Sequence, residues 1–169
     1  MKKIKLQIDP KEFKEKPKGE DIRLIRNRLK IVELTIEKII EAIESGKTIC
    51  PAILNGSRST DFVEQQLFLV DVDNDQTEIM FPPQKAIEHY LEHCITPTFW
   101  YPTFSNTDTH PKYRIAFVTG EPITDKNKRD SLQEILQFLI PQVDMGCKDA
   151  ARIFFGTNKR RLCYENYKC

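Results

Sequence analysis

The stretch of sequence that most constrains the fold runs from Glu64 to Asp73 and reads EQQLFLVDVD. Its apolar run, Leu67 to Val70, is too short for a buried helix and rich in strand-forming residues, so it predicts a buried strand. Side chains two apart on a strand point to the same face, so Asp71 and Asp73 project together. Two carboxylates held this close repel each other unless a cation lies between them. Their hard oxygen atoms favour Mg²⁺ or Mn²⁺.

Other interpretations of this acidic turn can be compared by spacing. The turn can simply close the strand, and the local sequence leaves that alternative open. An EF-hand loop that begins at Asp71 needs glycine at its sixth position and glutamate at its twelfth, where this chain has Gln76 and Pro82, so that interpretation fails. A phosphatase of the haloacid dehalogenase type also has Asp-x-Asp after an apolar strand, but it expects threonine where this chain has Asp75.

Length, composition and charge limit the classes of protein that remain. The 169 residues suffice for one domain with its own core. No apolar run is long enough for a membrane span, and the lysine-rich start lacks the apolar segment of a signal peptide, so we expect a cytoplasmic protein with no membrane partner. Five cysteines without paired C-x-x-C spacing indicate reduced thiols. Acidic residues predominate in 48–145 and basic residues in both flanking segments, which suits a metal-dependent site that handles a polyanion.

Hydrophobic periodicity divides the rest of the chain into short elements. Apolar and polar residues alternate over 4–8, which predicts a first edge strand, and the charged segment that follows, up to residue 30, is expected to be partly flexible. The other predicted elements are helices at 36–45, after Pro82 and Pro83, and at 128–139, and strands at 48–54, 98–104, 113–119 and 152–156. The polar turns between these elements hold the remaining candidate site residues.

The loop SNTDTHPK at 105–112 and the head of the next strand collect hydroxyl groups and cations that can grip a triphosphate, namely Ser105, His110, Lys112 and Arg114. Arg114 is the most informative of them. A charged residue at the head of an otherwise apolar strand needs a partner, which the aspartates or a phosphate would provide. Arg58, in the polar turn before the central strand, can reach the same cleft or remain an exposed loop residue.

Asp144 is a third acidic candidate, placed directly after Val143. A third carboxylate would complete a two-metal site, which needs ligands from separate elements to hold two ions about 4 Å apart. The same aspartate can instead cap a helix, and the local sequence leaves both interpretations open. Downstream, Arg152 starts the last predicted strand, which leads into a basic tail.

Taken in order, these segments resemble the archaeo-eukaryotic primase superfamily, in particular the primase-polymerase domains of plasmids, phages, integrative elements and some CRISPR loci. The resemblance is carried by GKTICPA at 46–52, FLVDVDN at 68–74, TFSNTDTHPKYRIAF at 103–117, PITD at 122–125 and DMGCKDAARIFFGTN at 144–158. It implies an α+β fold in which an RRM-like sheet with helices on one side joins a small N-terminal α/β unit. The chain would then be one domain, with a variable portion at 1–34, a motif-bearing core at 35–158 and a basic tail at 159–169.

The resemblance also assigns roles to the candidate residues. Asp71 and Asp73 match the first metal-binding pair and Asp144 the third acidic ligand, which together would hold two Mg²⁺ or Mn²⁺ ions. Contacts to the phosphates of the incoming nucleotide fall to Arg114 and His110 jointly, and the division between them is open. The residues expected to support binding or to stabilise transition-state charge are Ser105, Lys112, Arg58 and Arg152.

The function implied by the resemblance is DNA-templated synthesis or extension of primers by nucleotidyl transfer. Its partners would be a single-stranded DNA template, a primer and an NTP or dNTP, and a helicase or accessory domain supplied by another chain is a candidate further partner. Two alternatives come from other classes: a non-catalytic RRM-like nucleic-acid-binding or replication-initiation module, and a metal-dependent phosphatase. Binding alone would survive metal chelation and the joint loss of Asp71 and Asp73, whereas polymerisation would not.

Overall fold

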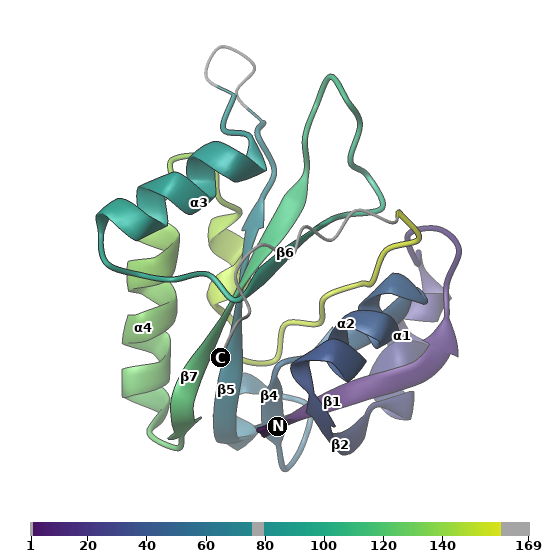
Figure 1. Ribbon diagram of the computed structural model, residues 1–169. Helices are drawn as coiled ribbons and strands as arrows, with labels where there is room; N and C mark the ends of the chain where they lie inside the picture. The colour runs from purple at the N-terminus through teal and green to yellow at the C-terminus, as the bar shows by residue number, and fades with distance from the viewer. Residues whose placement is uncertain (1, 76–79, 160–169) are drawn as a thin grey trace.

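The computed structural model describes residues 2–75 and 80–159 (Figure 1). Gln76, which served to reject an EF-hand, and all of the predicted basic tail except Lys159 lie outside the described residues. The described part contains two antiparallel sheets and four α-helices, so the predicted α+β class is confirmed. None of its helices has the length and apolar character that crossing a membrane requires.

The first sheet has the strand order β2-β1-β3 and is built from β1 (Lys3–Glu12), β2 (Lys30–Thr35) and β3 (Lys47–Cys50). β1 pairs with β2 from Lys3 opposite Thr35 to Ile8 opposite Lys30, and it pairs with β3 on its other side. The prediction of a first edge strand is therefore wrong, because β1 lies in the middle of its sheet.

The charged segment after β1 is ordered, contrary to the prediction of partial flexibility. It forms α1 (Glu20–Arg28) and leads into β2. Of the α1 residues only Ile25 is buried, so the helix has almost no apolar stripe from which periodicity could detect it. The predicted helix at 36–45 is confirmed as α2 (Ile36–Glu44), and Gly46, with a φ of 86°, follows its end.

The second sheet has the strand order β4-β5-β7-β6. It is built from β4 (Ala52–Leu54), β5 (Phe62–Val72), β6 (Phe99–Pro102) and β7 (Tyr113–Ile123). The strand predicted at 48–54 is in fact two strands, which separate at Pro51 and belong to different sheets. Proline lacks the backbone N–H that a continuous ladder needs, so the chain changes sheets at this residue.

The two faces of β5 pack against different parts of the molecule. Phe68, Val70 and Val72 pack with residues of α3 (Pro83–Glu92) and α4 (Lys126–Phe138), which lie together on one side in Figure 1. Leu67 and Leu69 pack with residues of β1 and α2 on the opposite face. Alternation continues this second face to Asp71, so this aspartate points towards the first sheet and its two helices, residues 3–50, called the N-terminal unit below.

From β5 onwards the chain runs strand, helix, strand, strand, helix, as the first five elements of a β-α-β-β-α-β unit do. The strand on the free side of β5 is β4, which precedes β5 in the chain. The strand predicted at 152–156 is wrong: within the described residues, this segment makes only an isolated bridge between Phe154 and Ile49. The RRM-like description therefore stays a prediction.

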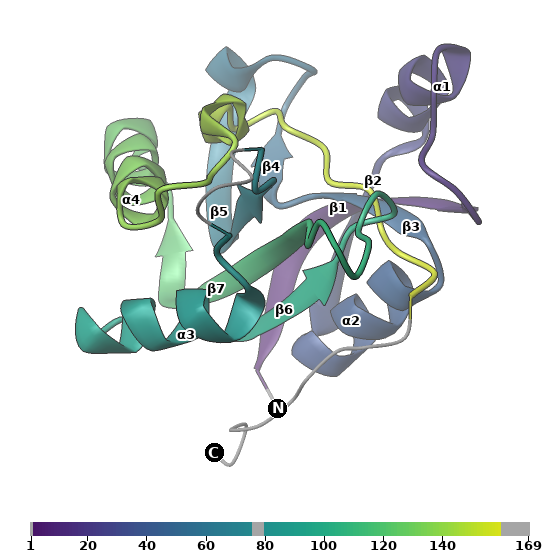
Figure 2. The same ribbon diagram turned by 90° about the horizontal axis from the view of Figure 1, so that it is seen from above.

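The segment after α4, residues 140–159, connects the second sheet with the first and is called the crossing segment below. It passes through the short 3-10 helix η2 (Met145–Lys148) beside α4 and then crosses to the first sheet (Figure 2). The Phe154 N–H donates to Ile49 O at 2.7 Å, and the Thr157 N–H donates to Ile43 O at 2.8 Å. These contacts hold the segment across the end of β5, where the candidate site lies.

Candidate functional site

The three predicted aspartates meet at the end of β5. Val143 forms a bridge with Val72. Beside it, the Asp73 N–H donates to Gln142 O at 3.1 Å and the Asp144 N–H donates to Asp71 O at 2.9 Å. These backbone bonds place Asp144 next to Asp71 although the two are far apart in the chain. All three aspartates line one cavity of about 400 Å³.

The same cavity is lined by five cationic side chains that come from both halves of the molecule. Lys112 and Arg114 belong to the loop and strand after β6, and Arg152 belongs to the crossing segment. The N-terminal unit contributes the other two, Lys16 and Arg26. A cavity with carboxylates and several cations fits a polyanion that binds together with divalent ions.

Each of the three aspartates is paired with one of these cations. Arg114 Nε lies 3.1 Å from Asp71 Oδ2, and Lys112 Nζ lies 3.3 Å from Asp73 Oδ1. Arg152 Nη2 donates to Asp144 Oδ2 at 2.9 Å. The protein therefore neutralises its own acidic cluster with side chains that could also bind phosphate.

Arg114 is fixed in place by the sheet and by the residues around it. It lies directly opposite Asp71 in the β5–β7 pair. Its Nη1 donates to Phe155 O at 2.6 Å, and its guanidinium lies 5.6 Å from the ring centre of Tyr101. Burial is the largest single effect and would lower the pKa of Arg114, but the Asp71 carboxylate, Tyr101 and Cys147 together outweigh it and the pKa is raised. Arg114 is therefore a permanently charged, immobile group.

Asp71 is only 5% exposed, and its Oδ1 has no hydrogen-bond partner within the described part of the chain. Burial raises the pKa of its carboxyl group, and the positive charge of Arg114 offsets part of that effect. A buried carboxylate oxygen without a donor is costly, and a bound cation would satisfy it.

Cys147 adds a sulfur atom to the acidic cluster. Its Sγ lies 3.9 Å from Asp71 Oδ2 and 3.6 Å from Asp144 Oδ2. One ligand atom from each of these three residues lies within 4.8 Å of the others, close enough to hold a metal ion. The thiol is 1% exposed, and burial raises its pKa.

The aspartates and Cys147 therefore fit a divalent ion. Asp71 supplies an unsatisfied buried oxygen, and Asp144 is held in position because the Gly146 N–H donates to its Oδ1 at 2.8 Å. Asp144 is also the N-cap of η2, so the capping interpretation that the sequence left open is confirmed, and its role as a metal ligand stays a prediction. Asp73 lies beside the group with its carboxylate on Lys112, and it is more exposed than Asp71.

Two predicted site residues lie outside this arrangement. Arg58 is exposed at the start of η1 (Ser59–Asp61), where its N–H donates to Asp61 Oδ2 at 2.9 Å. It precedes the first residue of β5, whereas the aspartates follow the other end of this 11-residue strand. The prediction that Arg58 reaches the cleft is therefore wrong.

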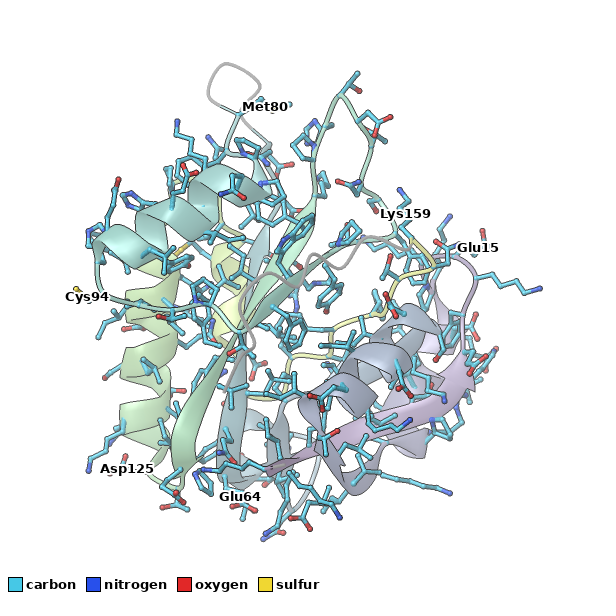
Figure 3. All side chains as sticks on the ribbon, in the orientation of Figure 1. Glu15, Glu64, Met80, Cys94, Asp125 and Lys159 are labelled. Carbon is cyan, nitrogen blue, oxygen red and sulfur yellow. The ribbon has the colours of Figure 1, made fainter. Side chains whose placement is uncertain are left out.

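His110 does not line the cavity but contacts its wall. Its Nε2 lies 2.9 Å from Asp73 O, so the ring supports the acidic turn from behind. Ser105 does line the cavity, as predicted. At the foot of the same loop, Lys159 Nζ donates to Asn106 O, and Figure 3 shows Lys159 where the loop and the segment after η2 come together.

The sequence prediction missed several residues of the cavity and of its acidic wall. They are Lys16, Arg26, Phe104, Phe155 and Cys147. Lys16 and Arg26 arrive with the docking of α1 and the turn before it, which no local pattern reveals. Cys147 could have been found, because it follows Asp144 by three residues and one helical turn brings such positions to the same side.

No protein-family model matches this sequence, and no curated protein sequence matches it. Among solved structures, the chain is similar to the AEP domain of the primase-polymerase (PrimPol) of cyanophage S-2L. The TM-score is 0.47 and the sequence identity 12%, over 92% of this chain and 72% of that chain. A similarity this distant leaves the functional conclusion to the site itself.

Proposed function

We propose that this chain is a DNA primase-polymerase, a nucleotidyltransferase that extends or starts a primer on a single-stranded template. The observation that carries the proposal is the cavity in which Asp71, Asp73 and Asp144 face a set of lysines and arginines. The motifs around these residues resemble those of the archaeo-eukaryotic primases.

The cations of the cavity divide into fixed and movable groups. Arg114 is 7% exposed and held by Asp71 and Phe155, so it provides a fixed positive charge against which a phosphate can be positioned. The side chains of Lys112 and Arg152 are 23% and 38% exposed. These two can leave Asp73 and Asp144 and bind the triphosphate.

This exchange of partners would prepare the site for chemistry. When Lys112 and Arg152 turn to the phosphates, the carboxylates of Asp73 and Asp144 become free to bind cations. Two divalent ions, when bound, supply activation of the attacking hydroxyl group and neutralisation of the charge that develops on the leaving pyrophosphate. Arg114 stays beside the reacting phosphate and stabilises its charge.

The remaining lining residues suit the other parts of the substrate. Phe104 and Phe155 offer apolar surface to a base or sugar, and Lys16 and Arg26 lie on the N-terminal side of the cavity. We expect these two cations to contact a nucleic-acid backbone, with an affinity that falls as salt is added.

The direct test is an extension assay. The protein is incubated with single-stranded template, labelled nucleotides and Mn²⁺, with and without a primer. We expect labelled product that depends on the template sequence and disappears in Asp144→Asn. The matched control is Asp108→Asn, an exposed loop aspartate, which should keep full activity. Absence of product from the folded wild-type chain, with and without primer, would overturn the proposal.

A second candidate function is a nucleic-acid-binding module without catalysis. The observation that favours it is that each aspartate already has a protein cation as partner, so the cluster is neutralised without a metal ion. This candidate predicts that binding to single-stranded DNA is unchanged by EDTA and by replacement of Asp71 and Asp73, and that no nucleotide is incorporated.

A further inference from the structure

Cys147 is the residue of the acidic cluster that the proposed function does not use. Its sulfur lies behind the carboxylates of Asp71 and Asp144, and it does not line the cavity itself. No basic side chain is paired with it in the interactions described above. The thiol can donate a hydrogen bond to either carboxylate, so its sulfur is in direct contact with two residues that are expected to bind the ion.

We propose that Cys147 is a protein ligand of the divalent ion at this site, together with Asp71 and Asp144, and that its sulfur makes the site select a transition-metal ion over Mg²⁺. The inference rests on the proposed function, because it names the ion that the same site would use. The test of this inference measures only ion binding. The role of Cys147 can therefore be disproved while nucleotidyl transfer is demonstrated, and it can be confirmed while nucleotidyl transfer is not found.

The distances agree with coordination by sulfur. Zinc in proteins lies about 2.3 Å from sulfur and about 2.1 Å from a carboxylate oxygen, which separates the two ligand atoms by about 3.6 Å in a tetrahedral site. Here the sulfur of Cys147 lies 3.6 Å from Asp144 Oδ2 and 3.9 Å from Asp71 Oδ2. The separations of the sulfur from the two carboxylate oxygens therefore match those around an ion of this size.

The carboxylates around the sulfur are arranged to receive an ion. Asp144 is oriented by the Gly146 N–H on its Oδ1, and its Oδ2, which also accepts a hydrogen bond from Arg152, faces the sulfur. Asp71 is almost fully buried and keeps one oxygen without a hydrogen-bond partner among the described residues. Three protein ligands leave a fourth position, and both carboxylates line the cavity, so this position would face the bound substrate.

Ligand chemistry gives the direction of selectivity. Mg²⁺ prefers oxygen ligands in an octahedral arrangement and loses its water reluctantly, whereas thiolate sulfur favours softer ions. Among divalent ions of the first row, affinity rises from Mn²⁺ to Co²⁺, and Zn²⁺ also accepts thiolate readily. When the ion binds, the proton of the thiol leaves to solvent and the sulfur donates its electron pair to the metal.

The first experiment uses Co²⁺ as the probe, because a cobalt–thiolate bond gives a charge-transfer absorption band in the near ultraviolet. The chain is titrated with Co²⁺ under reducing, oxygen-free conditions. We expect a band that saturates at one ion per chain in the wild type and is lost in Cys147→Ser. The Co²⁺ affinity of this variant should fall by at least about tenfold, the lower bound found even for residues that only support a ligand. Its Mg²⁺ affinity should change by less than about threefold, because serine leaves the carboxylates in place.

The matched control keeps Cys147 and removes the cysteines that are exposed or lie outside the described residues. It combines Cys94→Ser, Cys163→Ser and Cys169→Ser. Cys94 lies at the outer edge of the molecule at the end of α3, away from β5 (Figure 3). This variant should keep the band. A band that survives in Cys147→Ser and disappears in the control variant would overturn the proposal.

A second measurement needs no variant and so does not depend on whether Cys147→Ser folds. X-ray absorption at the zinc or cobalt edge of the loaded wild-type chain reports the atoms bound to the ion. We expect one sulfur and the remaining ligands oxygen or nitrogen. A coordination shell of oxygen and nitrogen only would contradict the proposal directly.

Discussion

Two aspartates in this molecule are buried against an arginine, and their surroundings differ. Asp9 of β1 accepts two hydrogen bonds from Arg28, at 2.8 and 2.6 Å, and a third from the Lys11 N–H. Both of its oxygens are satisfied. Asp71 of β5 lies 3.1 Å from Arg114 Nε and keeps one oxygen without a hydrogen-bond partner among the described residues.

This contrast shows that burial and ion pairing do not by themselves mark a functional acid. Both carboxylate oxygens of Asp9 are already used by hydrogen bonds from Arg28 and from the Lys11 N–H. Asp71 has a free acceptor and lies beside Asp144, Cys147 and the cations of the cavity. We therefore propose a structural role for the first pair and a functional role for the second.

The largest expected effect concerns activity. Asp71→Asn should reduce template-directed nucleotidyl transfer by about a thousandfold or more, because loss of a metal ligand removes several kcal/mol of transition-state stabilisation. Asp9→Asn should retain the wild-type rate within about threefold when rates are normalised to folded protein. Initial rates of primer extension measure both. Equal losses in the two variants would remove the distinction between the two pairs.

The second prediction reverses the order of the two variants and concerns stability. Asp9→Asn should lower the free energy of unfolding by about 2 kcal/mol, because it weakens the hydrogen bonds between a buried carboxylate and a charged partner that is itself partly exposed. Asp71→Asn should cost less in metal-free buffer, because Arg114 keeps its bond to Phe155 O and its contact with Tyr101. Urea unfolding at equilibrium measures both. A larger loss in Asp71→Asn would indicate that Asp71 is the more important structural acid.

The third prediction concerns stabilisation by ions. At a Mn²⁺ concentration 100 times its dissociation constant, the wild type should gain about 2.7 kcal/mol of unfolding free energy. The same gain is expected for Asp9→Asn and none for Asp71→Asn. Thermal or urea unfolding with and without Mn²⁺ provides the measurement. A gain that Asp71→Asn shares would place the ion elsewhere.

This gain should depend on pH in a defined direction. Burial raises the pKa of Asp71 above the ordinary value of 3.8, so the carboxyl group takes up a proton at a higher pH than an exposed aspartate does. Protons compete with the ion for this group. Stabilisation by Mn²⁺ should therefore decline on acidification before the pH reaches 3.8. In metal-free buffer the contribution of Asp71 to the free energy of unfolding has the opposite pH dependence. Because its pKa is raised in the folded state, this contribution is largest at low pH and is lost as the pH rises through the folded-state pKa.

The smallest predicted effect separates the movable cations from the fixed one. Arg152→Gln should raise KM for the nucleotide by about tenfold, the equivalent of one lost hydrogen bond to a charged group. The same change should strengthen metal binding in the absence of nucleotide, because the cation that competes for Asp144 is gone. Initial rates and calorimetry measure the two effects. Weaker metal binding in Arg152→Gln would argue against the exchange of partners.

The sequence predicted those parts of the molecule in which local pattern and tertiary structure agree. The apolar run at 67–70 predicted β5, and alternation placed Asp71 on one face of it. The prediction from sequence was wrong where tertiary contacts determine the local structure. α1 has a single buried residue, so its sequence reads as a flexible polar segment, and Pro51 divides one apolar run between two sheets.

The candidate site divides in the same way. Most of the predicted site residues lie in recognisable sequence motifs and line the cavity. They are Asp71, Asp73, Asp144, Lys112, Arg114 and Arg152. Arg58 adjoins β5 in sequence but lies before its first residue, at the other end of the strand from the aspartates. Lys16 and Arg26 reach the cavity only because the N-terminal unit packs there, and the local sequence around them does not predict that position.

The central claim is that the acidic cluster at the end of β5 binds divalent cations beside a triphosphate. The most direct measurement is anomalous X-ray scattering from crystals grown with Mn²⁺ and a non-hydrolysable nucleoside triphosphate. We predict a manganese peak between the carboxylates of Asp71 and Asp144, with the triphosphate against Lys112 and Arg152. A map with no manganese among these carboxylates, and with the Asp144–Arg152 pair intact, would contradict the claim.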